Sequence, residues 1–256
     1  MAALRRDFLP ADLSLAFESS GFKGSVVVQA RQTLEETRWL LDLAERSRLI
    51  LGVVGWVDLQ SPEVRSQLEL FVRNPKLVGI RHIVQSEPDD RFLLRPEFLR
   101  GVSVLEEFDL AYDILIYDKH LPVAAEFVAR FPRQRFVLDH MAKPPIKSGV
   151  IRPWEEGIRH LAEFPNVWCK LSGLVTEADW QRWEPEQIEP YLDIAFSAFG
   201  ADRLMFGSDW PVCLLAASYS RVNQVVMDYL DRRQPACYEA VFGGNAQKFW
   251  RLTVPR

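Results

Sequence analysis

The sequence predicts a TIM-type (β/α)8 barrel with seven of its eight strands present. Three observations lead to this α/β fold class. Seven short apolar runs recur along the chain, and a helix-like amphipathic stretch follows most of them. The runs are continuously apolar, as is typical of parallel strands buried on both faces. Polar or ionisable residues stand at the carboxyl ends of several runs, and in a barrel these ends share one mouth.

The predicted strands and helices alternate, which favours a parallel sheet with helical crossovers. The strands are Ser25–Gln29, Leu49–Val57, Leu77–His82, Tyr112–Tyr117, Arg135–His140, Val167–Leu171 and Arg203–Gly207. The helices are Phe8–Gly21, Thr33–Arg46, Pro62–Val72, Pro122–Phe131 and Trp154–Phe164. Thr33 followed by Glu36 matches a capping box, which predicts the start of the second helix.

An open doubly wound sheet is the alternative to a barrel. Such a sheet carries a glycine-rich phosphate loop after its first strand. Here Gly21 and Gly24 precede the first apolar run, and Gly243–Gly244 lie near the C-terminus. The sequence therefore favours the barrel.

The missing strand is predicted at the first position of that barrel. The helix-like segment Phe8–Gly21 would follow a strand that the sequence does not contain. Gln29 and Asp209 are then expected to flank the vacancy at the mouth. We favour an open gap over closure of a seven-stranded ring, and over coverage by Met1–Phe8, whose charged residues make a poor buried strand. We expect the native chain to start upstream, and this chain to be less stable than one extended by the strand.

Composition excludes several classes of partner. The net charge of −4 and the pI of about 5.7 give no reason to expect nucleic acid. No apolar run approaches the roughly 20 residues that span a bilayer, and no secretory signal is evident. The three cysteines form no C-x-x-C pair, so reduced thiols are expected. We predict a single cytoplasmic domain over residues 1–256, and the sequence leaves a homo-oligomer open.

Asp209 and His140 are the predicted catalytic residues. Asp209, in MFGSDWPV, follows an apolar strand. It is either a turn residue or a general base that takes a proton from water. His140, in FVLDHMAKP, ends another strand beside Asp139. It is either a histidine hydrogen-bonded to backbone or a ligand for a metal or a carbonyl oxygen.

Four further residues near strand ends are predicted to bind substrate, namely Arg81, His82, Gln29 and Trp210. Arg81 and His82 are adjacent in one strand. Successive strand residues point to opposite sides, so both cannot face the barrel axis in a regular strand. An arginine suits recognition of carboxylate or carbonyl oxygens.

Lys170 is the fifth predicted substrate-binding residue. It stands inside the apolar strand VWCKL, where a lysine is costly unless it is paired. We expect an acidic partner or an anionic substrate atom, and the alternative is a strand-end lysine that reaches solvent. His120 and His160 lie in polar, helix-like contexts and are predicted to be surface residues.

The inventory of motifs points to hydrolysis by activated water. The sequence contains no G-x-S-x-G elbow, no P-loop and no H-E-x-x-H motif. What remains is an aspartate that can activate water, with cations or imidazoles that can polarise a carbonyl. These groups suit an ester, a lactone or an amide.

Several motifs together resemble the amidohydrolase-2 family, in its branch of L-fucono-1,5-lactonases and related sugar-lactone hydrolases. They are LRRDFLPADL, SVVVQA, VGIRHIVQ, FVLDHMAKP, NVWCKLSGL, MFGSDWPV and VFGGNAQKFWRL, in family order over essentially the whole chain. The resemblance implies a barrel that opens with a His-x-His pair on its first strand, and this sequence has no histidine before His82. It also implies that His140 is the family's sixth-strand histidine and Asp209 its eighth-strand aspartate. The fifth-strand histidine has no counterpart, since that run supplies Asp113 and Asp118.

The resemblance implies a hydrolase that opens a sugar lactone, and it leaves the cofactor open. One histidine and one aspartate make a poor divalent site. The prediction is therefore either that no metal is required, as the lactonase branch implies, or that His140 and Asp209 hold one zinc ion. Two alternatives remain for the function, a metal-dependent hydrolase or decarboxylase of the same superfamily and an inactive barrel remnant.

Overall fold

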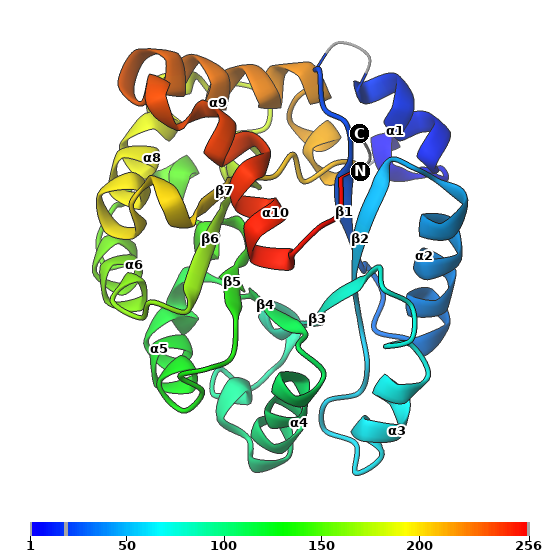
Figure 1. The fold of residues 1–256 in the computed structure, drawn as a ribbon. Helices are drawn as coiled ribbons and strands as arrows, with labels where there is room; N and C mark the ends of the chain where they lie inside the picture. Colours follow the sequence, from blue (N-terminus) through cyan, green and yellow to red (C-terminus); the bar gives the residue numbers. More distant parts are fainter. Residues whose placement is uncertain (1, 18–19, 255–256) are drawn as a thin grey trace.

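The computed structural model describes residues 2–17 and 20–254 and contains one sheet of seven parallel strands. Each strand pairs with the next one along the chain. Figure 1 shows the strands curling around a central axis with helices outside them. The strands are β1 (Ser25–Val28), β2 (Ile50–Gly55), β3 (Leu77–Ile83), β4 (Ala111–Leu115), β5 (Phe136–Leu138), β6 (Val167–Leu171) and β7 (Leu204–Phe206). The predicted fold class and all seven predicted strands are confirmed.

Helices connect the strands and cover the outside of the sheet (Figure 1). They are α1 (Pro10–Phe17), α2 (Leu34–Arg46), α3 (Val64–Glu69), α4 (Pro96–Glu107), α5 (Leu121–Ala129), α6 (Trp154–Ala162), α7 (Leu174–Glu177), α8 (Pro185–Phe199), α9 (Tyr219–Arg233) and α10 (Asn245–Trp250). The predicted start of α2 is confirmed, because the Thr33 hydroxyl accepts a hydrogen bond from the Glu36 amide at 3.1 Å. No helix in the described ranges is long and apolar enough to cross a membrane.

The sheet is open between β1 and β7. In the described residues these two edge strands are not paired, and no strand lies between them. An aromatic contact joins them instead, since Phe22, just before β1, stacks on Phe206 of β7 at 5.8 Å. The seven described strands therefore do not close into a ring, as predicted, and the identity of the missing strand stays a prediction.

The N-terminal segment does not form a strand in this opening. The short turn Ala2–Leu4 packs against the turn Val212–Leu215, which follows β7. Phe8 packs edge-on against Trp210, with ring centroids 5.3 Å apart. Met1 lies outside the described residues, as do residues 18 and 19 of the predicted helix Phe8–Gly21.

The C-terminal helix fills the amino-terminal end of the barrel. Phe249 and Trp250 of α10 form a cluster with side chains of the strands, including Val54 and Val137. The Arg135 guanidinium, at the start of β5, donates to the Phe249 carbonyl. In Figure 1, α10 lies inside the curve of the strands. The opposite, carboxyl ends of the strands are therefore the end at which a substrate can enter.

Helix α4 approaches the loop after β2 so closely that only glycine fits at one position. A Cβ atom added to Gly101 would lie 1.9 Å from the Leu59 carbonyl oxygen. Alanine is a better helix former than glycine by about 1 kcal/mol. Overpacking a tight interface costs about 1–3 kcal/mol, and here the obstructing atom belongs to the backbone.

We predict that Gly101→Ala lowers the free energy of unfolding by about 1–3 kcal/mol in urea titrations, despite the gain in helix propensity. Ser103→Ala, at an exposed position of the same helix, is the control and should leave stability unchanged within about 0.5 kcal/mol. A Gly101→Ala protein more stable than the parent would contradict the close approach.

Candidate active site

His140 and Asp209 face each other at the carboxyl ends of the strands. The His140 Nε2 atom lies 3.7 Å from a carboxylate oxygen of Asp209, and their side chains are 12% and 18% exposed. Both residues have a left-handed backbone, with φ of 52° and 53°. This conformation is uncommon for residues other than glycine. The predicted strand Arg135–His140 is thus too long, because the chain leaves the sheet after Leu138.

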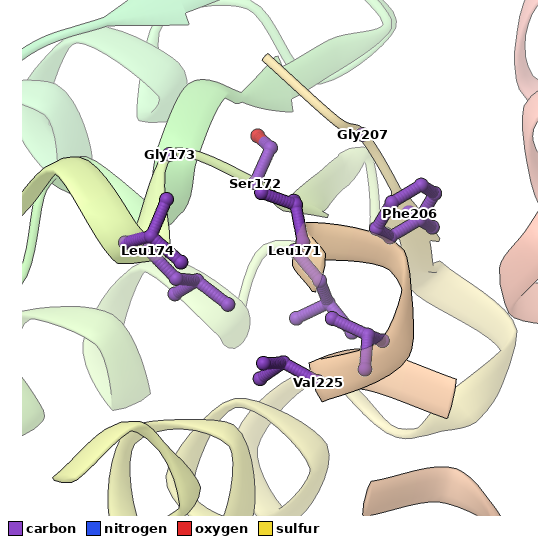
Figure 2. A pocket seen from close by; sticks show the side chains of 10 residues that line it. Leu171, Ser172, Gly173, Leu174, Phe206, Gly207 and Val225 are labelled. Carbon is purple, nitrogen blue, oxygen red and sulfur yellow. The ribbon is translucent and has the colours of Figure 1, made fainter. Parts of the chain in front are cut away.

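The other ring nitrogen of His140 is held by Ser172, which follows β6. The Ser172 Oγ atom lies 2.8 Å from His140 Nδ1, and Ser172 is buried. Gly173 packs directly against the imidazole, because a Cβ at this position would lie 2.9 Å from His140 Cγ. Figure 2 shows the Ser172 hydroxyl pointing away from a small apolar cavity that Leu171 and Val225 line behind the strands.

Four buried charged residues form a network inside the barrel. The Lys170 ammonium lies 2.5 Å from a carboxylate oxygen of Asp113 and 2.6 Å from one of Asp139. The second Asp139 oxygen accepts from the Arg81 guanidinium at 2.7 Å. The Trp250 ring lies 5.1 Å from the Lys170 ammonium. Lys170 thus has the acidic partner that its position in an apolar strand required.

The two carboxyl groups of this network differ in their protonation equilibria. Burial raises the pKa of Asp113 to about 6, although Lys170 opposes the shift. Burial also acts on Asp139, but the charges of Lys170 and Arg81 outweigh it and lower the pKa of that carboxyl. Burial likewise opposes the charge on Lys170, yet the two carboxylates raise its pKa. Asp139 and Lys170 therefore stay charged at neutral pH.

Arg81 and His82 point to opposite sides of β3, as strand geometry predicts. His82 faces the helices, where its ring stacks on Phe92 with centroids 4.7 Å apart. Its Nε2 atom lies 2.7 Å from a Glu87 carboxylate oxygen, and Trp56 Nε1 donates to Nδ1 at 3.4 Å. Burial lowers the pKa of His82. The structure does not bring His82 together with His140 and Asp209.

The remaining predicted binding residues lie at different depths. Gln29 is fully buried, and its amide donates to the Arg81 carbonyl at 3.1 Å. The Arg81 guanidinium in turn donates to the Gln29 carbonyl. Trp210 is half-buried beside Asp209. Contact with a substrate remains a prediction for all five binding residues, as do the catalytic roles of His140 and Asp209.

His120 is not a surface residue, and that prediction was wrong. Its side chain is 1% exposed. Its Nδ1 atom accepts from the Tyr117 amide at 3.2 Å, and its Nε2 atom lies 3.2 Å from Asp90. The turn after β4 folds the imidazole inward to cap its own backbone. His160 is exposed, as predicted.

The described residues do not supply a complete metal site. No group of three or more His, Cys, Asp or Glu residues in ranges 2–17 and 20–254 is arranged to hold a metal ion. His140 and Asp209 provide two donors, whereas protein zinc sites use three or four. The donor set therefore does not fit zinc, and we derive no catalytic step through a metal.

Comparison with known proteins identifies the family. Residues 2–252 match the family model described as amidohydrolase. The chain belongs to the amidohydrolase family. It is 42% identical to an L-fucono-1,5-lactonase of Burkholderia multivorans, over 100% of this chain and 90% of the relative. It is 41% identical to an L-fucono-1,5-lactonase of Burkholderia ambifaria, over 99% of this chain and 88% of the relative.

A solved structure shares the fold of this amidohydrolase. It is an amidohydrolase from Burkholderia multivorans with bound zinc. That protein superposes on this one with a TM-score of 0.95 and is 41% identical in sequence. The match covers 99% of this chain and 92% of that one. An amidohydrolase from Bifidobacterium longum, at 23% identity and a TM-score of 0.74, shows the same fold. The predicted family and enzyme class are thereby confirmed.

Three features of the site escaped the sequence analysis. Ser172 gave no signal beyond its place directly after a strand. The pairing of Asp113 and Asp139 with Lys170 joins β4 and β6 to the segment just after β5. A carboxylate inside the apolar run YDILIY was the sign of a buried ion pair. Trp250 lies 80 residues after Lys170 in a C-terminal helix, and no pattern links the two.

We predict that Lys170→Met destabilises the protein by about 3–5 kcal/mol at pH 8, because two buried carboxylates lose their shared cation. Asp113 has its pKa raised above the unfolded value, so this carboxyl is protonated in the folded state at pH 5. The penalty should therefore shrink between pH 8 and pH 5 in urea titrations. Lys147→Met, which removes an exposed pair with Asp179, is the control and should cost less than about 1 kcal/mol. A Lys170→Met penalty that is independent of pH would contradict this account.

Proposed function

We propose that this amidohydrolase opens a sugar lactone, L-fucono-1,5-lactone or a close analogue, by water that Asp209 activates. The observation that carries the proposal is the facing pair of His140 and Asp209 at the mouth. The L-fucono-1,5-lactonases to which the chain is 41% and 42% identical support the substrate class. The reaction adds one water across the acyl–oxygen bond and yields the hydroxy acid.

The spacing of the pair suits a water molecule. A hydrogen bond between heavy atoms measures about 2.8 Å. Since His140 Nε2 and the Asp209 carboxylate are 3.7 Å apart, one oxygen atom can lie within this distance of both. Asp209 then takes a proton from water as its oxygen attacks the lactone carbonyl carbon. When the tetrahedral intermediate collapses, the ring oxygen leaves with the proton held by Asp209.

His140 is suited to donate a hydrogen bond in this reaction. Burial lowers its pKa, although Asp209 and Asp139 oppose the shift, so the imidazole is neutral at neutral pH. A neutral imidazole that carries its proton on Nε2 can donate to the carbonyl oxygen as negative charge develops there. As the water oxygen attacks the carbonyl carbon, the Nε2–H donor passes from the water to the carbonyl oxygen.

Lys170 and Arg81 would place positive charge beneath the lactone. Both are about nine-tenths buried. Lys170 donates to Asp113 and Asp139, and Arg81 donates to Asp139 and to the Gln29 carbonyl. Lys170 keeps a third N–H, and Arg81 Nε has no partner in the described residues. In this proposal they favour the developing oxyanion, while Trp210 contributes an apolar wall.

A metal-dependent hydrolysis is the second candidate. The bound zinc in the solved Burkholderia multivorans relative favours it. The donor set described above favours the first candidate, because it leaves zinc short of ligands. An assay of the purified protein for lactone opening after chelation separates the two candidates.

We predict that Asp209→Asn lowers the rate of lactone hydrolysis by about 10²–10⁴-fold while the fold is retained, because a general base is lost. The rate is followed by proton release at neutral pH, with spontaneous hydrolysis subtracted. Asp193→Asn, in α8 far from His140 in sequence and hydrogen-bonded only to Tyr229 in the described contacts, is the matched control. Activity of Asp209→Asn within a factor of about three of the parent would rule out this role.

We predict that dialysis against a chelator removes any bound zinc without changing kcat for the lactone by more than about twofold, since two donors hold a divalent ion poorly. Metal content is measured by elemental analysis before and after dialysis. Loss of activity that zinc restores would favour the metal-dependent candidate. An absence of lactone opening in the untreated protein would contradict both.

A further inference from the structure

The hydroxyl of Ser172 is the one side-chain group in the described residues that contacts the far nitrogen of His140. The Oγ–Nδ1 distance is 2.8 Å. Ser172 is 3% exposed, so solvent does not compete for this hydroxyl. The bond fixes the ring about its χ angles and aims Nε2 at Asp209.

The direction of this hydrogen bond follows from the groups around it. A buried hydroxyl proton needs an acceptor, and His140 Nδ1 is the acceptor that the described contacts offer. If Ser172 donates to Nδ1, the imidazole proton is on Nε2 and points toward the Asp209 carboxylate. If Ser172 accepted instead, the lone pair of Nε2 would face that carboxylate across 3.7 Å, which is electrostatically unfavourable.

Gly173 also packs closely against the imidazole. A Cβ on this residue would lie 2.9 Å from both Cβ and Cγ of His140 and 3.0 Å from Nδ1. Gly173 also has φ of +65°, a conformation that side-chain-bearing residues rarely adopt. The pair Ser172–Gly173 therefore leaves one place for the ring and one partner for Nδ1.

We propose that Ser172 is a positioning residue that holds His140 in the Nε2–H tautomer, so that its proton points at the substrate and at Asp209. Its kinetic consequence rests on the proposed lactone hydrolysis, whereas the tautomer itself does not. In this state Nε2 has no free lone pair. A metal bound at Nε2 would require the imidazole proton to be on Nδ1, and the Ser172 hydroxyl would then have to donate to another acceptor.

The tautomer is measured directly by ¹⁵N–¹H correlation spectra of the four histidine rings. His140 signals are assigned by their loss in His140→Gln. We expect the parent to show the Nε2–H pattern at His140, and Ser172→Ala to show a mixture or a shift toward Nδ1–H. Parent spectra with the proton on Nδ1, or a Ser172→Ala spectrum unchanged at His140, would overturn the proposal.

Kinetics give the second readout. Removing a partner that orients a functional histidine typically costs about 10–100-fold. We expect Ser172→Ala to lower kcat within this range with KM changed less than about threefold, and Ser172→Thr, which keeps the hydroxyl, to recover most of kcat and the parent tautomer. Ser148→Ala, which removes an exposed hydroxyl bonded to the Pro145 carbonyl, is the control.

The two readouts separate this inference from the proposed function. If the parent opens no lactone, the proposed function fails while the spectra still decide the tautomer. If Ser172→Ala folds, with a melting temperature near that of the parent, and keeps the parent kcat, Ser172 does not position a reacting group. A folded Ser172→Thr variant that behaves like Ser172→Ala would also count against the hydroxyl.

Discussion

The buried ion network is the constraint on which the rest of the barrel interior depends. Lys170 joins β6 to β4 through Asp113 and to the end of β5 through Asp139. Arg81 then joins Asp139 to β3, and through Gln29 to the end of β1. Charges in an apolar interior are stable only when they are paired. The network therefore fixes how five of the seven strands meet around the axis, and it does so directly beneath the mouth.

This network also explains why His140 and Asp209, the proposed reacting groups, can have an irregular backbone. Residues 140–143 all have positive φ, as does Asp209. Left-handed conformations of such residues cost free energy and persist where the surroundings hold them. Asp139, anchored by two cations, precedes the first of these segments. The bend after it turns His140 out of the strand and toward Asp209.

The fold was largely predictable because its signals are local. Continuous apolar runs gave every strand, and Val167–Leu171 was predicted to the residue. The prediction that Arg81 and His82 point to opposite sides of their strand was correct, because successive residues of β3 alternate. The errors come from tertiary contacts that periodicity does not encode. His120 was placed at the surface because its neighbours in sequence are polar, yet its backbone turn buries it. The predicted strand Arg135–His140 was too long because nothing in its composition indicates that His140 has a left-handed backbone conformation.

The two central residues of the candidate site were predictable, whereas the residues that contact them were not. Histidine and aspartate after apolar strands marked His140 and Asp209, and the structure brings these two together. Ser172, which holds the imidazole, is an ordinary serine in the sequence. The sequence predicted an acidic partner for Lys170, but the identity of Asp113 and Asp139 follows only from the curvature of the sheet. In each case the sequence pattern does not tell which residues on separate strands come close together in space.

We propose above all that His140 and Asp209 act as a unit on one water and one carbonyl. A double-mutant cycle of His140→Gln, Asp209→Asn and the combined variant tests it most directly, with kcat/KM for the lactone measured in all four proteins. Residues that act together give non-additive losses. We expect kcat/KM of the combined variant to be no more than about tenfold below that of the less active single variant. Losses that multiply in full would show that the two residues act independently and would contradict the account.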